Sequence, residues 1–254
     1  MGTLLVVDGS DVCRAPVVAF ALRSRFASGT WLAEASVATR GLTATEGHTM
    51  CESAATRLGF TGPAIAFYGA HRAAPLTVAD IAGADLVLTA ERAQRSAVVR
   101  MLPGTQATVF TWKEALVLAS VLVDRRRIGA LSAPADLPGL ARALHGARGT
   151  VPLIEPAVRT GVFHWRRAAE ADPLTIEGGH GGRAEHRRIT QESADVAAAL
   201  AHRLTDLVQT RMPEADLEQP APRARSLRRS AGGRELSRSG TGGGRAATSR
   251  ARSA

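Results

Sequence analysis

Near its N-terminus the chain carries the stretch Thr3-Leu4-Leu5-Val6-Val7-Asp8-Gly9-Ser10-Asp11-Val12-Cys13-Arg14-Ala15-Pro16. The run from Thr3 to Val7 is β-branched or leucine and predicts a short buried strand. Turn-forming residues follow it, and an apolar helical pattern then runs from Ala15 to Leu22. Pro16 suits the first turn of that helix, where its missing N–H costs nothing. A strand, a loop and a helix in this order open a βαβ unit.

The pattern repeats along the chain. We expect strands at 31–39, 85–89 and 107–110, a loop at 72–77, and helices at 51–58, 78–82, 91–101, 113–123 and 190–211. This alternation predicts an α/β fold with three layers, in which helices cover both faces of a central parallel sheet of about four strands. The domain is expected to span 1–212. Residues 125–167 contain several prolines and no clean period, so we interpret them as an irregular insertion with short helices.

The last part of the chain has a different composition. From Pro213 it is rich in proline, glycine, serine and arginine, so we predict that 213–254 is disordered. Residues 223–254 hold nine arginines and one acid, Glu235, so they carry +8 of the net charge of +9. The basic character belongs to this tail. It could contact acidic partners or nucleic acid without sequence specificity, or simply be solvated.

Composition excludes several classes of protein. Hydrophobic residues make up 45% of the chain and aromatics only 4%, so the core must consist mainly of alanine, valine and leucine. Two cysteines, Cys13 and Cys51, are too few for a disulfide-rich scaffold. No apolar run approaches the roughly 20 residues that span a bilayer, and the N-terminus does not resemble a signal peptide. We therefore expect no membrane span and a cytoplasmic location.

The loop after the first strand has the layout of a phosphate cradle. Backbone N–H groups in such a loop can point inward, and the N-terminus of the following helix adds partial positive charge. Arg14 at the end of the loop would offer a bidentate fork to phosphate oxygens. The candidate phosphate-binding residues are Gly9, Ser10, Asp11, Val12, Cys13 and Arg14.

This loop resembles that of the low-molecular-weight protein tyrosine phosphatases, which have a strand, a cysteine, five residues, an arginine, a serine or threonine, and a proline. The chain matches the six-residue step from Asp8 to Arg14, a second cysteine at Cys13, and Pro16. It departs at the nucleophile, which is Asp8, and at three further positions: Ser10, Asp11 and Ala15. Downstream segments are also similar: Arg40-Gly41, His48–Cys51, His71–Thr77, Ala84–Thr89 and Arg92–Arg95. The resemblance covers 1–124 and, more loosely, 170–211.

The resemblance implies a phosphatase-I-like fold and a division of labour. In that family the cysteine thiolate attacks phosphorus, the arginine and loop N–H groups stabilise the oxygens, and an Asp-Pro aspartate acts as general acid. Asp172-Pro173 is the only Asp-Pro pair of the chain, which makes Asp172 the candidate acid. Asp8 is a weaker nucleophile at phosphorus, and Asp11 adds a second negative charge beside one arginine. We therefore expect impaired catalysis and reduced phosphate affinity.

Two arrangements that would restore catalysis, and two other functions, stay open. Cys13 could replace the nucleophile, although a small buried residue is the simpler interpretation. Asp8 and Asp11 could hold Mg²⁺, although their Asp-x-x-Asp spacing differs from that of aspartate-based phosphatases. Beside a non-catalytic relative that binds phosphorylated or acidic partners, the chain could be an active phosphotyrosine phosphatase or arsenate-reductase-like enzyme, or an interaction protein acting through its tail. We expect no metal or cofactor, because no metal-ligand spacing connects His48, His71, His164, His180, His186 and His202.

Overall fold

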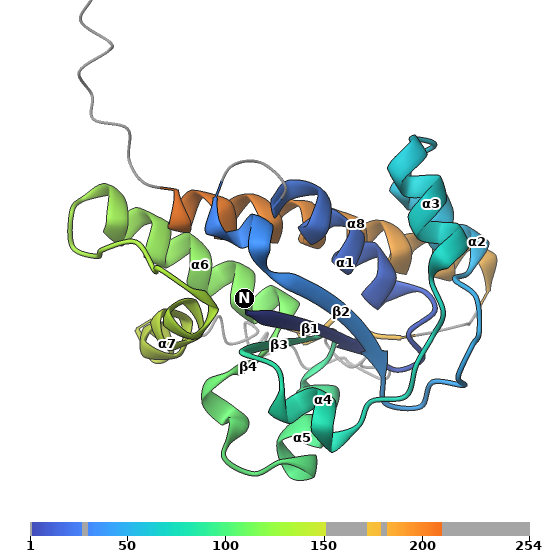
Figure 1. Cartoon of the computed structure of the whole chain (residues 1–254), viewed down its shortest axis with the longest axis horizontal. Helices are drawn as coiled ribbons and strands as arrows, with labels where there is room; N and C mark the ends of the chain where they lie inside the picture. The colour runs from blue at the N-terminus through green and yellow to red at the C-terminus, as the bar shows by residue number, and fades with distance from the viewer. Residues whose placement is uncertain (1, 27–29, 151–171, 179–181, 210–254) are drawn as a thin grey trace, which may run out of the picture. The chain divides into compact units, whose positions relative to one another are not determined.

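The computed structural model describes residues 2–26, 30–150, 172–178 and 182–209. The strands are β1 (Thr3–Asp8), β2 (Ser36–Gly41), β3 (Leu86–Thr89) and β4 (Val109–Thr111). The α-helices are α1 (Arg14–Phe26), α2 (Glu52–Leu58), α3 (Gly62–Ala70), α4 (Val78–Ala82), α5 (Arg92–Met101), α6 (Trp112–Arg127), α7 (Leu137–Ala147) and α8 (Arg183–Val208), with short 3₁₀ turns η1 (Trp31–Glu34) and η2 (Thr105–Ala107) (Figure 1).

The four strands form one parallel sheet in the order β2-β1-β3-β4. Leu4 pairs with Val37 of β2 on one side and with Leu86 of β3 on the other. Since the strands are parallel, their carboxyl ends lie along one edge of the sheet, which is where ligand sites of such folds are built. The predicted fold class, a central parallel sheet between helices, is confirmed.

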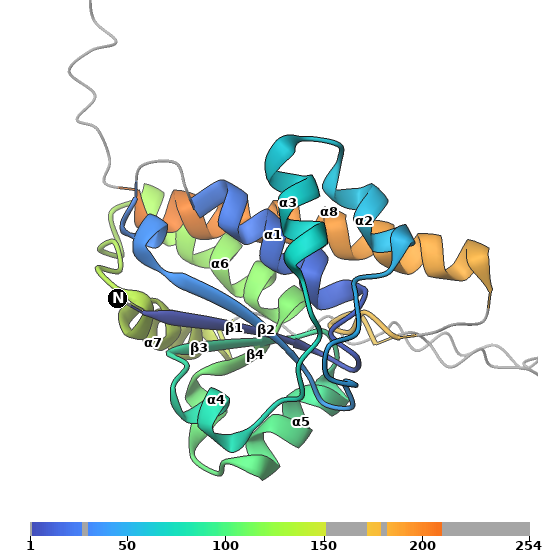
Figure 2. The ribbon, with the colours of Figure 1, turned by 45° about the vertical axis from the view of Figure 1, so that its right-hand side comes forward.

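Helices cover both faces of the sheet, as Figures 1 and 2 show. On one face, Leu4 and Val6 belong to a large core that includes residues of α1, α6, α7 and α8. On the opposite face, Leu5 and Val7 pack with residues of α4 and α5. The strict alternation of β1 side chains between two cores explains its continuous apolar run, because a strand buried on both faces has no solvated side.

Several predicted boundaries were wrong. The expected strand 31–39 begins only at Ser36, since Trp31–Glu34 form a 3₁₀ turn. Helix α3 was not predicted at all. In contrast, α4 has the predicted bounds, because Thr77 and Asp80 form a capping box whose sequence signal is strong.

The expected irregular insertion 125–167 is more regular than predicted. Residues up to Arg127 extend α6, and α7 is an amphipathic helix that Asp136 caps by accepting the N–H of Gly139 at 2.6 Å. Pro138 lies in the first turn of α7, where proline is tolerated. Residues 151–167 lie outside the described part.

The last helix is also longer than predicted: α8 begins at Arg183 and ends at Val208. The chain divides into one compact unit, Met1–Arg211, and a remainder, Met212–Ala254. The predicted disordered tail, 213–254, lies outside the described residues. In the described part, every helix is too short or too polar to cross a membrane.

Candidate functional site

The loop between β1 and α1 lies at the carboxyl edge of the sheet, where the sequence predicts a phosphate cradle. Asp11 adopts a left-handed backbone conformation, with φ of 56°, which aspartate tolerates better than most residues. His71 donates from Nε2 to the Asp11 carbonyl at 2.7 Å and so fixes the turn. Gly41 of the neighbouring strand passes so close that a Cβ there would lie 2.8 Å from the Asp11 nitrogen. The loop is therefore held tightly by its neighbours.

Asp8 occupies the centre of this loop and is almost fully buried, with 1% of its surface exposed. Its Oδ1 accepts the backbone N–H of Asp11 at 2.6 Å. Its Oδ2 accepts the N–H groups of Arg14 at 3.2 Å and Ala15 at 3.1 Å. Carboxylates are favoured at helix N-termini by the orphan N–H groups and the helix dipole. The anion at the start of α1 is thus the protein's own side chain.

Arg14 is buried too, and its guanidinium has acidic partners. Its Nη1 donates to Glu91 Oε1 at 2.6 Å and to the Ile176 carbonyl at 2.5 Å. Its Nε lies 3.8 Å from Asp8 Oδ2. Gly178 packs over the same guanidinium, since a Cβ at Gly178 would lie 2.8 Å from Nη2. One nitrogen of the guanidinium, Nη1, is therefore already engaged by two protein acceptors, Glu91 and the Ile176 carbonyl.

Glu91 gathers donors from three directions. Besides Arg14, its Oε1 accepts the Gln94 side-chain amide at 2.9 Å and the Gly178 backbone N–H at 3.1 Å. Glu91 is the residue just before α5 and was not singled out from the sequence. Its 77-residue separation from Arg14 leaves no local signal of their pairing.

Asp11 adds a further buried carboxyl group. Its Oδ2 accepts the Ala74 N–H at 3.1 Å, while Oδ1 is buried without a hydrogen bond and lies 3.7 Å from His71 Nε2. Burial is the main cause that raises the pKa of Asp11 to about 7, and the nearby charge of Asp8 acts in the same direction. Burial also lowers the pKa of His71, which favours the neutral ring.

The predicted phosphate-binding residues are consecutive in the loop, but they differ in exposure. Asp11, Cys13 and Arg14 are buried, whereas Gly9, Ser10 and Val12 are partly exposed. The carboxylates of Asp8 and Glu91 both contact Arg14, so negative groups outnumber the arginine. A phosphate dianion would meet repulsion in this loop unless a carboxylate were protonated or displaced.

The predicted general acid, Asp172, lies on the segment 172–178 that reaches Arg14 through Ile176. Its carboxylate contacts Arg92 Nε at 3.0 Å, the Leu174 N–H at 3.0 Å and the Thr175 hydroxyl at 3.3 Å. None of these groups belongs to the loop. Asp172 and Glu91 share the lining of a hollow of about 420 Å³. The role of Asp172 as an acid stays a prediction.

Neither rescue of catalysis gains support from the geometry. The Asp11 carboxylate accepts the Ala74 N–H and the Asp8 carboxylate accepts backbone N–H groups of the loop, so backbone donors already hold both aspartates. The Cys13 sulfur lies with Cys51 and His186, and no contact in the described residues joins it to a phosphate-binding group. That cluster was missed in the sequence, because its members come from distant segments.

Comparison with known proteins gives matches among solved structures only. No family model matches the chain, and neither does any curated protein. The solved structures include the tyrosine phosphatase AmsI of Erwinia amylovora, with 16% identity over 82% of this chain and 94% of that one and a TM-score of 0.49. They also include the YwlE arginine phosphatase of Geobacillus stearothermophilus, with 17% identity over 81% and 94% and a TM-score of 0.47. A low-molecular-weight protein tyrosine phosphatase from T. tengcongensis matches with 17% identity over 80% and 99% and a TM-score of 0.46. These matches include the class that the loop motif resembles, and at such identities they assign no activity.

Proposed function

We propose that this chain is a phosphatase-fold protein without phosphatase activity, a non-catalytic relative of the low-molecular-weight protein tyrosine phosphatases. The observation that carries the proposal is the Asp8 carboxylate, which accepts the N–H groups of Asp11, Arg14 and Ala15 in the middle of the loop. A carboxylate supplies no thiolate, and carboxylates that attack phosphorus act with Mg²⁺. The contacts of Asp8 support a structural role for this side chain.

Phosphate affinity of the loop should be weak for a related reason. A phosphate group would have to displace Glu91 to reach Nη1 of Arg14, and it would lie beside the Asp8 carboxylate. Breaking this partly buried ion pair leaves a charge without its partner, which is costly. We therefore propose that phosphorylated or acidic partners, if bound, are not held by this loop in the way that a phosphatase holds its substrate.

The first experiment is hydrolysis of para-nitrophenyl phosphate by the purified full chain, with and without Mg²⁺. The matched variants are Asp8→Cys, which restores a thiol at the nucleophile position, and Arg14→Ala, which removes the fork. We expect no turnover by the wild type in either condition. Turnover by Asp8→Cys would show that the loop lacks only its nucleophile.

The contrary result is equally clear. Wild-type turnover that disappears in Arg14→Ala would overturn the proposal, and dependence of that turnover on Mg²⁺ would indicate carboxylate chemistry. Turnover that persists in Arg14→Ala would instead point to a contaminating phosphatase, so each preparation should be compared with a mock purification.

The arginine-rich residues 223–254 favour a second candidate function, contact with acidic partners or nucleic acid in the cytoplasm. Binding of a mixed-sequence DNA duplex should fall steeply with added salt and vanish when 213–254 are removed. Equal binding by the full chain and the truncated chain would exclude the tail as the binding element.

A further inference from the structure

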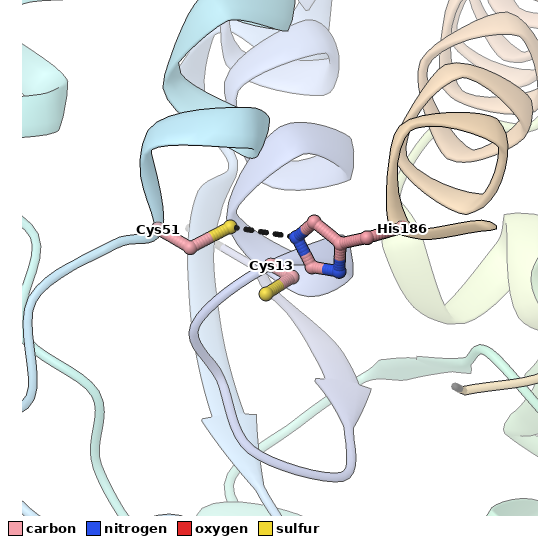
Figure 3. Close-up of side chains that lie close together, drawn as sticks. All are labelled: Cys13, Cys51 and His186. Atoms are coloured by element: carbon pink, nitrogen blue, oxygen red, sulfur yellow. Dashed lines mark hydrogen bonds between the residues drawn. The ribbon is translucent and has the colours of Figure 1, made fainter. Parts of the chain in front are cut away.

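Three soft ligand atoms lie together beside the loop. Cys13 is the last loop residue before α1, Cys51 precedes α2, and His186 is in the first turn of α8. Figure 3 shows the Cys51 sulfur pointing toward the His186 imidazole, with the Cys13 side chain close to both. The Cys51 sulfur lies 3.3 Å from His186 Nε2, and each residue offers a ligand atom within 4.8 Å of the other two.

The cluster is partly enclosed by apolar side chains and partly open to solvent. Cys13 is buried, whereas Cys51 and His186 are partly exposed, so the cluster opens to solvent on one side. Apolar residues of α1, α2 and α3 pack around the cysteines, including Val17, Ala54 and Ala64. Ligands in such a partly apolar setting are held in place by packing, which reduces the cost of ordering them around an ion.

The loop is steadied beside the cluster by backbone contacts. Cys51 donates its N–H to the Val12 carbonyl at 3.0 Å, which joins the start of α2 to the residue before Cys13. The Cys51 sulfur also accepts the Ala54 N–H at 3.4 Å. The two cysteines are thus positioned by the backbone and not only by their own side chains.

We propose that Cys13, Cys51 and His186 form a zinc site, with two thiolate sulfurs and one imidazole nitrogen as ligands. This donor set is one that Zn²⁺ takes in proteins, with Zn–S distances of about 2.3 Å and Zn–N distances of about 2.0–2.1 Å. The separations among the three ligand atoms need only small side-chain movements to reach such a geometry. A fourth position remains for water or for a ligand from outside, on the partly exposed side.

Two features favour zinc over harder ions and over a disulfide. Mg²⁺ and Ca²⁺ prefer oxygen, whereas sulfur and imidazole suit thiophilic ions. A Cys13–Cys51 disulfide would use neither His186 nor its contact with Cys51.

A bound ion would join three segments that are far apart in sequence. It would connect the Asp8–Arg14 loop with α2 and with the start of α8, which lies 135 residues beyond Cys51. Binding energy of this kind is also folding energy, because the unfolded chain has no preformed site. The ion would therefore stabilise the loop through Cys13.

The test uses the full chain, reduced with a phosphine and stripped of metal with a chelator. Zn²⁺ is titrated in competition with a chromophoric chelator, and Co²⁺ is used in parallel because thiolate ligands give it strong near-ultraviolet charge-transfer absorption. We expect about one Zn²⁺ per chain and a thiolate-to-cobalt absorption band. Loss of a direct ligand should weaken zinc binding at least about 10-fold, since even outer-shell partners are worth about 10–100-fold.

Three variants make the experiment decisive. Cys51→Ser keeps a side chain that can cap α2, and His186→Gln keeps a polar group on α8. His202→Gln is the matched control, because His202 lies on the same helix, is more than half exposed and pairs with Asp206. The first two variants should lose affinity and the control should not.

Two results would overturn the proposal. One is reduced wild-type protein without thiolate-to-cobalt absorption, which needs no variant and is unaffected by a variant that fails to fold. The other is equal zinc affinity in the wild type and His186→Gln. A Cys13–Cys51 disulfide that forms readily in air, with no zinc affinity after reduction, would replace the zinc site by a redox pair.

Discussion

The two ends of the first loop carry groups of opposite electrostatic character. On one side, Asp8 places a carboxylate at the N-terminus of α1, and backbone N–H groups satisfy it. On the other side, Cys13 lies close to Cys51 and His186, and the ligand atoms of these three residues suit a cation. At the first end the Asp8 carboxylate is itself the anion, so the N–H groups there do not need an anion from solution. The second side has the donor set for an external ion.

The largest effect should come from the carboxylate side. Asp8→Ala removes the acceptor of three backbone N–H groups and one partner of Arg14, so it should cost about 3–5 kcal/mol of unfolding free energy. Urea unfolding of the full chain measures this loss. Asp124→Ala is the matched control, since Asp124 is exposed and pairs only loosely with Arg127, and it should change stability by less than about 0.5 kcal/mol. A similar small loss in both variants would refute the structural role of Asp8.

Asp11 should make stability depend on pH. Its folded pKa is about 7 against an ordinary 3.8, so the folded chain keeps a proton that the unfolded chain releases. The stabilisation is complete below about pH 4 and is lost as pH rises to about 7, by roughly 2–4 kcal/mol. Asp11→Asn should abolish this fall, and unfolding in the presence of a chelator at several pH values measures it.

Other groups around Asp11 must be separated from it. Asp8, Arg40 and His71 all lie near its carboxyl group. His71 acts in the opposite direction, because its lowered pKa costs stability as pH falls below its ordinary 6.5. The difference between the wild type and Asp11→Asn cancels these contributions. Parallel pH profiles for the two proteins would contradict the assignment to Asp11.

Substitution of Glu91 tests whether the Arg14 guanidinium binds oxyanions once its ion pair with Glu91 is removed. Glu91→Gln removes the charge that pairs with Arg14 and should cost about 1–2 kcal/mol. The freed guanidinium should then bind oxyanions, so sulfate should raise the melting temperature of the variant more than that of the wild type at equal ionic strength. Glu192→Gln, which breaks a pair with Lys113 outside the loop, is the control. Equal sulfate effects in all three proteins would show that Glu91 does not occupy the fork.

The smallest effect is expected at the sulfur side when metal is absent. Cys51→Ser retains an acceptor for the Ala54 N–H, so it should change stability by less than about 0.5 kcal/mol. Cys51→Ala loses that cap and should cost about 1 kcal/mol. Thermal unfolding of the stripped proteins measures both. A loss of equal size in the two variants would mean that the thiol acts through packing and not through the cap.

Local sequence signals predicted the parts of the fold that depend on neighbours in the chain. The apolar run of β1, the turn before Arg14 and the bounds of α4 depend on local sequence, and all three were predicted. Helix α3 escaped because it has no amphipathic stripe: Ala64 is its buried residue, while Ile65 and Tyr68 are exposed. The difference between local and distant partners also explains which residues of the site were predicted.

Asp8 and Arg14 were identified because they are six positions apart in one loop. Glu91 and His186 were not, because their partners are brought to them only by the sheet and by α8. Pairing across such separations leaves no periodic or spacing signal. The two carboxylates of the loop could be counted from the sequence, but the third carboxylate beside Arg14, that of Glu91, could not.

The reach of the loop across the chain has a consequence for biosynthesis. The ribosome releases β1 and α1 early, yet Arg14 gains the Ile176 carbonyl, and α1 gains the apolar side chains of α8, only when the last part of the domain has emerged. Until then the nascent chain exposes Leu22 and its neighbours on α1. Chains that stop before α8 should therefore be held by chaperones or aggregate, since incomplete folding leaves such surfaces uncovered.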